Sequence, residues 1–495
     1  MLEELSLTSV GLIFMLCILV HRFLFSRSAG NLPPSPGLCL PIIGHIYLLR
    51  EDMRPTLARL RKQCGDVYYM KWGSVPVVIL SGYDVIVDAF KKQADLFAAR
   101  PKLPVTENLT RGKGIVMVSG EPWREHRRFT LGTLKDFGMG KTRLDTTIQE
   151  QAALMVEEIG KHNGEPFDPK DVISAHVANV ICSMLFRRQF KHDDPRFRGL
   201  IKILDENVRI MGGLANFFPW AAHMPGDPLG VGRVIANCNT LRDYCADIVR
   251  EHVETYNENC IDNLVSAYIK EVKKHEQTNE QTTMSFEYLE ILIMDLFSAG
   301  TETTSTALRW SLVCLTEYPE IQEGLYTEIT SSIGNFRPPS VLDRSSLVRV
   351  EAFYMEVLRF CSLGIISLMH SSTETVTFRG YTIPSNAAVI YDLISVFSDP
   401  DIWGDPLVFR PDRFIDEHGK LIKRDEFIPF FIGKRSCIGE SLARMELLIF
   451  LSSLVQRFRF ESPAGEEVSM ATTDGAFGIV HAPKPYRIVA VPRGG

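Results

Sequence analysis

The cysteine Cys437 constrains this chain more than any other residue, because it stands on a short turn directly before a helical pattern. Apolar residues recur after the turn at helical spacing, at Leu442, Met445 and Ile449, and predict a packed helix that runs to about residue 458. A helix amino-terminus and neighbouring cations both favour an ionised thiol. We therefore expect Lys434 and Arg435 to lower the pKa of Cys437, so that its thiolate can bind a metal.

Two glycines, Gly433 and Gly439, bound this turn. Because they lack a Cβ, they allow unusual backbone dihedrals and let a flat, bulky group such as a haem approach the backbone closely. A lone intracellular cysteine is more often a small buried hydrophobe, so Cys437 taken alone does not decide between packing and ligation.

The complete motif favours ligation. It reads Phe-x-x-Gly-x-Arg-x-Cys-x-Gly from Phe430 to Gly439, and it resembles the haem-thiolate signature of the cytochrome P-450 monooxygenases. The resemblance implies that Cys437 is the axial ligand of a haem b iron and that Phe430, Gly433 and Arg435 contact the cofactor. A thiolate ligand raises electron density on the iron and favours O–O cleavage.

Length, charge and cysteine content exclude several other classes of protein. The chain has 495 residues, 45% of them hydrophobic, and no low-complexity linker in its middle, which is typical of one large compact unit. A net charge of −6 gives no indication of a nucleic-acid partner. The ten cysteines form no CxxC pair and no zinc spacing, which indicates a reducing compartment without a disulfide framework.

The amino end predicts a membrane anchor and a stiff linker. Residues 5–20 carry no charge and apolar residues resume at 23–25, so a helix of about 20 residues can span a bilayer. Acidic residues precede this run and arginines follow it, the reverse of a signal peptide, which places the remainder in the cytosol. We predict an anchor at 1–25, a proline-rich linker at 26–48 and a haem-binding catalytic domain at 49–495. The resemblance to animal microsomal P-450 enzymes implies the endoplasmic reticulum membrane.

Helical periodicity dominates the chain from about residue 82 to residue 360. β-Branched and aromatic residues at 66–81, with a turn in their middle, predict a hairpin. The predicted class is mainly α with small β-sheets (α+β), and the resemblance implies the cytochrome P-450 fold. The charged segment 270–283 is predicted to be a solvated connector. The apolar segment 217–230 is predicted to be a loop that either contacts the membrane or plugs the core.

A long helix is predicted from Phe286 to about Glu317, roughly 48 Å in length and apolar on nearly all sides. Its middle, residues 299–306, contains poor helix formers whose hydroxyls can bond backward to carbonyls and locally open the helix. One interpretation is a kink in which Glu302 pairs with an arginine. The other is a gap for dioxygen in which Glu302 and Thr303 pass protons. The run from Ala299 to Thr304 resembles the family's oxygen-binding groove, which favours the second interpretation.

A basic helix is predicted around Trp123, where Trp123 and Arg127 share one face while Arg124 and Arg128 share the next. From the residues alone it is a solvated helix. The resemblance implies that Trp123 and Arg127 contact the haem propionates, and that Arg124 and Arg128 receive an acidic, NADPH-dependent cytochrome reductase. By the same positional match, further propionate partners are Arg100, His370 and Arg435.

A structural network is also implied by the resemblance, with Glu356, Arg359 and Arg413 forming buried ion pairs behind the Cys437 turn. The run 300–310 together with 439–444 looks most like the animal family-2 microsomal group. The chain departs from that group's usual residues at Ile365 and Met369, where prolines are usual, at Thr375, where an aspartate is usual, and at Phe431, where serine or glycine is usual.

These observations lead to one main hypothesis and two alternatives. The main hypothesis is a membrane-bound haem-thiolate monooxygenase that inserts one oxygen atom from O₂ into an apolar substrate. No Gly-x-Gly-x-x-Gly motif follows a strand, so electrons from NADPH must arrive through a partner. The alternatives are a haem-thiolate isomerase or dehydratase without a reductase, and a non-catalytic haem or sterol-binding protein. The segments expected to line the pocket are apolar, which indicates a fatty acid, steroid or xenobiotic: 101–122, 206–216, 292–301, 363–369 and 474–480.

Overall fold

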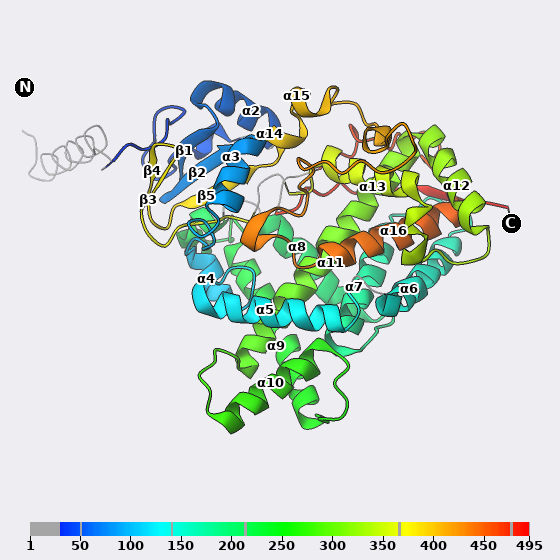
Figure 1. The fold of residues 1–495 in the computed structure, drawn as a ribbon, viewed down its shortest axis with the longest axis horizontal. Coiled ribbons are helices and arrows are strands. Elements are labelled where there is room, and N and C mark those ends of the chain that lie inside the picture. Colours follow the sequence, from blue (N-terminus) through cyan, green and yellow to red (C-terminus); the bar gives the residue numbers. More distant parts are fainter. Residues whose placement is uncertain are drawn as a thin grey trace, which may run out of the picture.

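The structure is a computed structural model that describes residues 30–49, 52–139, 142–211, 215–364, 368–475 and 479–494. Most of these residues lie in helices, and the strands form small sheets, the largest of them at one side of the helical body (Figure 1). The expected class, mainly α with small β-sheets, is therefore confirmed. The predicted anchor at 1–25 lies outside the described residues, and so does Ile365. Within the described ranges, no helix is both long and apolar enough to cross a membrane.

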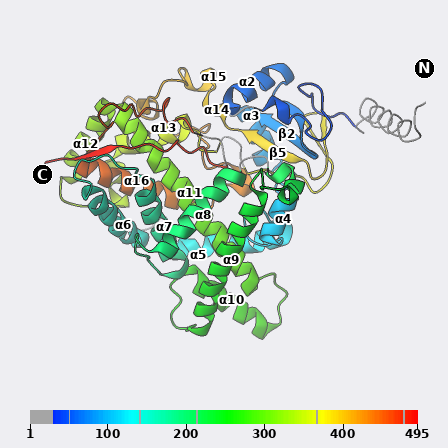
Figure 2. The same cartoon turned by 180° about the vertical axis from the view of Figure 1, so that it is seen from behind.

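The longer helices make up the body of the molecule, and Figure 2 shows α8 and α9 on the face opposite to that of Figure 1. Their bounds are α2 (Met53–Cys64), α5 (Gly120–Asp136), α6 (Thr142–Gly160), α7 (Lys170–Phe186), α8 (Pro195–Met211), α9 (Val231–Glu254), α10 (Leu264–Thr278), α11 (Phe286–Glu317), α12 (Pro319–Ile333), α13 (Val348–Phe360) and α16 (Glu440–Arg457). Short α-helices are α3 (Tyr83–Val87), α4 (Pro104–Thr110), α14 (Ile394–Phe397) and α15 (Pro400–Trp403).

Single turns of tighter or wider helix connect many of these elements. The 3₁₀ turns are η1 (Ile46–Leu48), η3 (Ala215–Phe217), η4 (Pro219–His223), η5 (Val341–Ser345), η6 (Pro411–Phe414) and η7 (Gly433–Arg435), and η2 (Asp88–Lys92) is a π-helical turn. Of these, η7 positions the site, because it directly precedes Cys437.

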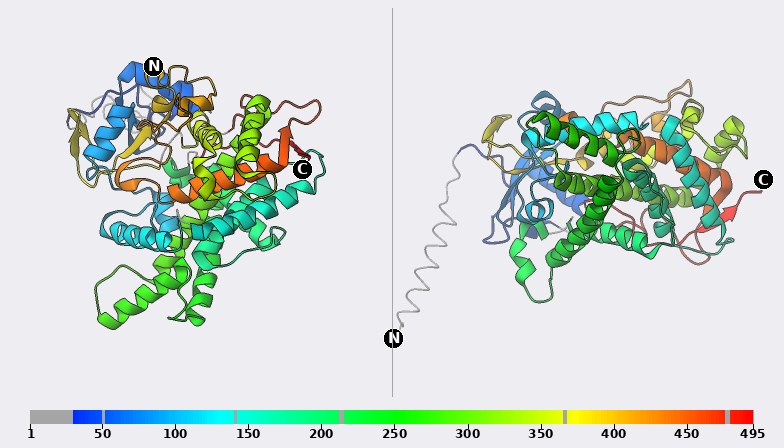
Figure 3. Two further views of the ribbon diagram at one scale, coloured as in Figure 1. Left: turned by 45° about the vertical axis from the view of Figure 1, so that its right-hand side comes forward. Right: turned by 90° about the horizontal axis from the view of Figure 1, so that it is seen from below.

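The predicted hairpin at 66–81 is confirmed as strands β1 (Val67–Trp72) and β2 (Val75–Ser81), paired antiparallel. A distant strand, β5 (Ala388–Asp392), joins β2 in parallel. The other strands form two separate pairs, β3 (Val376–Phe378) with β4 (Tyr381–Ile383) and β6 (Phe458–Glu461) with β7 (Val489–Pro492). Figure 3 agrees that the sheet β1-β2-β5 lies at one side of the body. It has a small core of its own with α2.

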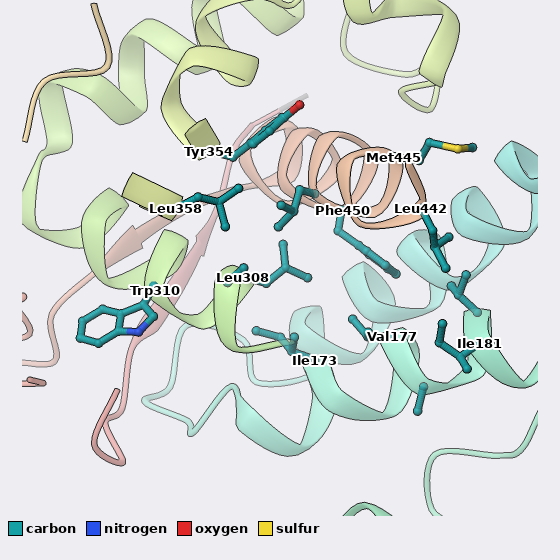
Figure 4. Packing of buried hydrophobic residues seen from close by; sticks show 14 of the residues in the cluster. Ile173, Val177, Ile181, Leu308, Trp310, Tyr354, Leu358, Leu442, Met445 and Phe450 are labelled. Atoms are coloured by element: carbon teal, nitrogen blue, oxygen red, sulfur yellow. The ribbon is translucent and has the colours of Figure 1, made fainter. Parts of the chain in front are cut away.

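The central core forms where α11 packs against α7 and α16. Figure 4 shows Ile173, Val177 and Ile181 of α7 facing the same interior as Leu308 of α11 and Phe450 of α16. Glycine at position 300 favours the close approach of α7 and α11, because a Cβ there would lie 2.4 Å from Cδ1 of Ile181 and would force that side chain to shift. The predicted helices at 286–317 and after Cys437 are both confirmed with nearly the expected bounds.

The predicted buried ion-pair network is also present. Glu356 is fully buried and accepts hydrogen bonds from Arg359, with Nε 2.7 Å from one carboxylate oxygen, and from Arg413, with Nε 2.9 Å from the other. Both arginines also donate to backbone carbonyls, including those of Phe397 and Trp403. Because every charge in the network is paired, α13 is fastened to the segment that leads to the Cys437 turn.

One loop prediction needs correction, and for a second the structure supports one of its two alternatives. Residues 270–278 are not a connector, because α10 continues to Thr278 and buries Tyr268, Ile269 and Val272 on one face. In the segment 217–230, Phe217 and Phe218 are buried against the hairpin, so the segment does plug a core. Trp220 is nevertheless 53% exposed on the same segment.

Candidate active site

The Cys437 turn is held by its own backbone and by α5. The Cys437 N–H donates to the carbonyl of Phe430 at 2.9 Å, which closes the loop from 430 to 437. An Arg127 guanidinium N–H donates to the carbonyl of Ser436 at 2.6 Å. The ring of Phe430 lies under Arg444 of α16, with Cζ 5.0 Å from the ring centroid. These contacts place the thiol at a rigid position before α16.

The expectation that Lys434 and Arg435 lower the pKa of Cys437 is wrong. Lys434 forms an ion pair with Asp95, and Arg435 turns to the carbonyls of Ala98 and Val118 at 2.8 and 2.6 Å. Burial raises the pKa of Cys437, and it outweighs the backbone N–H of Gly439 and the charge of Arg127, which act in the opposite direction. Ionisation of this thiol therefore needs a stronger charge than the protein alone supplies, such as a metal ion.

Accessibility adds a second fact about Cys437. Its side chain is accessible to solvent, yet the surrounding protein still desolvates the thiol enough to raise its pKa. We infer that the thiol lies in a recess of the fold, where a ligand can reach it.

The unusual backbone dihedral predicted for both glycines of the motif is confirmed at Gly433 and absent at Gly439. Gly433 has φ +75°, and a Cβ there would lie 1.8 Å from the Phe90 carbonyl oxygen, so the close approach is to protein backbone. Gly439 has an ordinary φ of −89°, which contradicts the expected unusual dihedral. A Cβ on Gly439 would lie 4.0 Å from Sγ of Cys437, at ordinary van der Waals distance.

Phe431 has φ +64°, a left-handed conformation that is strained for a residue with a bulky side chain. Its ring stacks on Tyr391 at 4.0 Å between centroids and also contacts Phe90 and His370, each at 4.9 Å. The aromatic contacts offset the backbone strain at Phe431. This is the position where the family-2 group usually has serine or glycine.

Three arginines converge beside this turn without a carboxylate partner among the described residues. Arg100, Arg127 and Arg435 donate only to backbone carbonyls and to the Ser436 hydroxyl. Burial lowers the pKa of Arg435 to about 8 and that of Arg100 to about 10, and Arg435 is further lowered by Arg100 and Arg127. Two of these cations are buried and Arg127 is half-buried, and a bound anion would stabilise a group that repels itself in this way.

Trp123 lies in the same group and supplies a neutral donor. Its indole is 6% exposed, and the buried Nε1–H has no hydrogen-bond partner in the described part of the protein. The Arg435 guanidinium lies over its ring, with Cζ 3.9 Å from the centroid. The site therefore offers buried cations and an unpaired N–H, a donor set that suits an anionic oxygen.

His370 lies close to these cations but carries no charge. Its Nδ1 is 2.9 Å from the Phe97 carbonyl, and its ring packs on Phe90. Burial lowers the pKa of His370 well below its ordinary value, and the charges of Arg100 and Arg435 lower it further. Because Nδ1–H donates to the Phe97 carbonyl, the Nε2 of this neutral ring can only accept a further hydrogen bond.

The middle of α11 presents two exposed residues in an otherwise buried helix, Ala299 and Thr303, one turn apart on the same face. The Thr303 hydroxyl donates to the Ala299 carbonyl at 2.8 Å, which confirms the predicted backward bond. The helix nevertheless continues through this segment without interruption, so the predicted opening is absent. Because its proton is donated to Ala299, the exposed Thr303 hydroxyl can only accept a further hydrogen bond.

Glu302 points in a different direction from Thr303, because adjacent residues do not share a helix face. It is 6% exposed and forms no ion pair within the described ranges, so the alternative in which Glu302 pairs with an arginine is not supported. Burial raises the pKa of Glu302 to about 7, with the charge of Asp205 adding to the rise and Lys170 opposing it. A carboxyl that titrates near neutral pH is suited to proton transfer.

Asp295 belongs to this face of α11 and was missed by reasoning from sequence. Its carboxylate accepts the backbone N–H groups of Ile115 and Val116 at 2.7 and 3.0 Å, which ties the loop before α5 to α11. Burial raises the pKa of Asp295 to about 6. The available signal was a single carboxylate within the otherwise uncharged run 291–301 of this helix.

The outer surface beside the ligand turn is hollowed as well. A hollow of about 430 Å³ borders Phe430 and Phe431, and both cations and anions line it, among them Arg344, Arg444 and Glu440. It opens to solvent and does not include Cys437, Thr303 or Glu302, so we do not treat it as the substrate pocket.

Comparison with known proteins agrees with this geometry. The family model described as Cytochrome P450 matches residues 33–490. Cytochrome P450 2C23 of Rattus norvegicus is 36% identical over 476 residues, which cover 94% of each chain. Cytochrome P450 2J2 of Homo sapiens is 36% identical and covers 96% of this chain and 94% of its own. Cytochrome P450 2H1 of Gallus gallus is 35% identical and covers 98% and 99%.

The chain therefore belongs to the cytochrome P450 family, and the relatives carry the family-2 designation that the sequence motifs indicated. It is an oxidoreductase of the P450 monooxygenase class, with the mainly helical fold of that family. Family membership implies a haem bound through a cysteine thiolate.

Proposed function

We propose that this protein is a membrane-bound haem-thiolate monooxygenase that inserts one atom of O₂ into an apolar substrate with electrons from NADPH. The electrons would arrive through a partner reductase. The observation that carries the proposal is the position of Cys437, on a rigid turn beside buried arginines that have no carboxylate partner among the described residues.

The residues around Cys437 fit a haem b. Cys437 would ligate the iron, while Arg100, Arg127 and Arg435 would bind the propionates together with the unpaired Nε1–H of Trp123. His370 would lie beside the propionates as a neutral ring whose Nδ1–H stays on the Phe97 carbonyl, and Phe430 and Gly433 would keep the turn in shape. When bound, the haem supplies the activation of O₂. Binding of the propionates would also offset the mutual repulsion of the arginines.

Glu302 and Thr303 would manage protons. The Glu302 carboxyl, with a pKa of about 7, can take a proton from solvent and release it near neutral pH. The Thr303 oxygen accepts a hydrogen bond, because its own proton is donated to Ala299. As the two side chains point in different directions, transfer between them would require water molecules.

The partner surface would include Arg124 and Arg128 of α5. Both side chains are exposed, and Arg124 forms only a surface ion pair with Glu121 at 3.2 Å. Such a pair stabilises the protein little, so both cations remain able to attract an acidic reductase.

The membrane surface would combine the anchor at 1–25 with apolar residues near the small sheet. Ile42 is 76% exposed in the linker, and Trp220 is 53% exposed on the segment that packs on the same small core. Together they would hold the body, with its catalytic domain at 49–495, at the cytosolic face of the endoplasmic reticulum. An apolar fatty acid, steroid or xenobiotic would enter from that membrane.

The test is turnover by the reconstituted full chain with NADPH-dependent reductase, NADPH and a panel of apolar substrates. We expect an oxygenated product that requires the reductase. We also expect Cys437→Ser to abolish the red-shifted absorbance band of the reduced, carbon monoxide-bound protein, whereas Cys260→Ser, at an exposed free thiol, keeps it. Product formation from a peroxide substrate without reductase would support an isomerase or dehydratase, and tight sterol binding without turnover would support a binding protein.

A further inference from the structure

Phe431 combines a costly backbone conformation with an aromatic side chain that the proposed function does not use. Its φ of +64° lies in the left-handed region, which glycine adopts freely and a bulky residue does not. The Phe431 N–H donates to the Ile428 carbonyl at 3.0 Å, so a backbone hydrogen bond belongs to this conformation. A bulky residue persists in such a conformation only when the surrounding structure holds it there.

The ring of Phe431 belongs to a four-ring cluster, which consists of Phe90, His370, Tyr391 and Phe431. Every pair of these rings lies within 6.0 Å between centroids, and the closest pair is Phe431 stacked on Tyr391 at 4.0 Å. The other three residues are at most 7% exposed. Phe431 is therefore the member through which the ligand turn is attached to a buried group of rings.

The three partner rings are fixed by the small sheet and by η2. Tyr391 lies on β5, and the backbone of His370 pairs with Val389 of the same strand at 2.8 and 2.7 Å. Phe90 lies on the π-helical turn η2. Its carbonyl oxygen occupies the space that a Cβ on Gly433 would take, so Phe90 contacts the ligand turn with its backbone as well as its ring. The cluster therefore joins the ligand turn to the sheet, separately from the contacts made by α5 and α16.

The position of Phe431 is coupled to that of Cys437 through one peptide unit. The Cys437 N–H donates to the carbonyl of Phe430 at 2.9 Å. That carbonyl and the N–H of Phe431 belong to the same planar peptide group, so they move together. A displacement of Phe431 therefore shifts the acceptor that holds the backbone of Cys437.

We propose that Phe431 is a positioning residue for the Cys437 thiol. Its ring, held in the four-ring cluster, keeps Sγ in the place from which it ligates the haem iron. Without the ring, the turn can move away from the sheet, and the Phe430 carbonyl and Cys437 move with it. The inference rests on the proposed role of Cys437 as the iron ligand.

The test follows the red-shifted absorbance band of the reduced, carbon monoxide-bound holoenzyme over time at a fixed temperature. Phe431→Gly removes the ring and also relieves the backbone strain, which offsets part of the lost packing, so the variant should fold. We expect it to lose the band roughly 2- to 10-fold faster, the factor that one aromatic pair contributes. Phe431→Ser removes the ring but keeps the strain, and it should lose the band at least as fast.

Tyr391 provides the partner variants. Tyr391→Leu removes the stacked ring and should accelerate loss of the band by a similar factor, without an additive effect in the double variant with Phe431→Gly. Tyr391→Phe keeps the stack and should lose the band at the wild-type rate. Equal acceleration in the leucine and phenylalanine variants would overturn the inference, because the hydroxyl and not the ring would then be required.

Phe190→Leu is the matched control, because Phe190 is a partly buried residue between α7 and α8 that stacks on Phe197 at 4.8 Å. It should lower the thermal unfolding temperature and leave the rate of band loss unchanged. Acceleration in this control equal to that in Phe431→Gly would overturn positioning, since general loss of packing would explain both. A wild-type rate in both Phe431 variants, with the band absent in Cys437→Ser, would overturn this inference alone. Retention of the band in Cys437→Ser would overturn the proposed ligand itself.

Discussion

The guanidinium of Arg435 lies over the indole of Trp123, with Cζ 3.9 Å from the ring centroid. Arg435 is two residues from Cys437 in sequence, yet it is held by this ring and by the carbonyls of Ala98 and Val118. The contact keeps a desolvated cation beside an unpaired indole N–H. The contact therefore prepares a site for an anion. It also keeps the charge of Arg435 away from the Cys437 thiol, although the two residues are close in sequence.

Trp123→Phe tests this anion site. Phenylalanine keeps a ring under Arg435 but removes the N–H. We therefore expect the free energy of haem binding to weaken by ~1.5–3 kcal/mol, the contribution of one hydrogen bond to a charged group. Titration of the purified apoprotein with haem would measure it. Trp72→Phe removes an equally unpaired buried N–H in the small core and should retain haem normally. Equal effects of both changes would show a packing effect instead.

Reversal of Arg124 and Arg128 to glutamate tests the partner surface. Both residues are exposed, so the variant should fold normally while the reductase concentration for half-maximal turnover rises. Because salt screens surface charges, the defect should grow as ionic strength is lowered. Peroxide-driven turnover should not change. The control Arg250→Glu, a charge reversal on the exposed face of α9, should leave the reductase concentration for half-maximal turnover unchanged. A parallel loss of the peroxide-driven route would assign these arginines to folding.

Thr303→Val tests the proton route while keeping β-branching. The hydroxyl that bonds Ala299 is lost, but the helix ladder remains, so haem content and thermal stability should change little. Product per NADPH should fall, by roughly 100-fold or less, while peroxide rises. Glu302→Gln should act in the same direction. Normal product yield combined with lower stability would indicate that these residues only maintain the helix.

The pH dependence of the product yield should report Glu302. Its pKa is about 7, so the carboxyl loses its proton as pH rises through that value, and product per NADPH should fall. Asp205 raises this pKa and Lys170 lowers it, and the two form an ion pair at 2.7 Å. Asp205→Asn should move the midpoint to lower pH, and Lys170→Met should move it to higher pH. Shifts in one common direction would contradict this assignment, and Glu302→Gln should abolish the transition.

Local patterns were sufficient for much of the fold. The helix at 286–317, the helix after Cys437 and the hairpin at 66–81 all depend on periodicity within one segment, and each is present near its expected bounds. The connector prediction for 270–283 failed, because charged residues dominate the composition there while Val272 still belongs to the apolar stripe of α10.

The sequence by itself determined the family motif around Cys437, the class of fold and the residues that could serve a haem, because these depend on residue types at short spacing. The tertiary structure decided how those residues act. Arg435 donates to the Val118 carbonyl and not toward Cys437, and Gly433 leaves room for the Phe90 carbonyl oxygen. Glu302 forms no ion pair with an arginine among the described residues. Each of these outcomes depends on a segment distant in sequence, which supplies a carbonyl or a ring or shields the residue from solvent. A pKa and a hydrogen-bond partner are properties of that assembled surrounding, which no local spacing encodes.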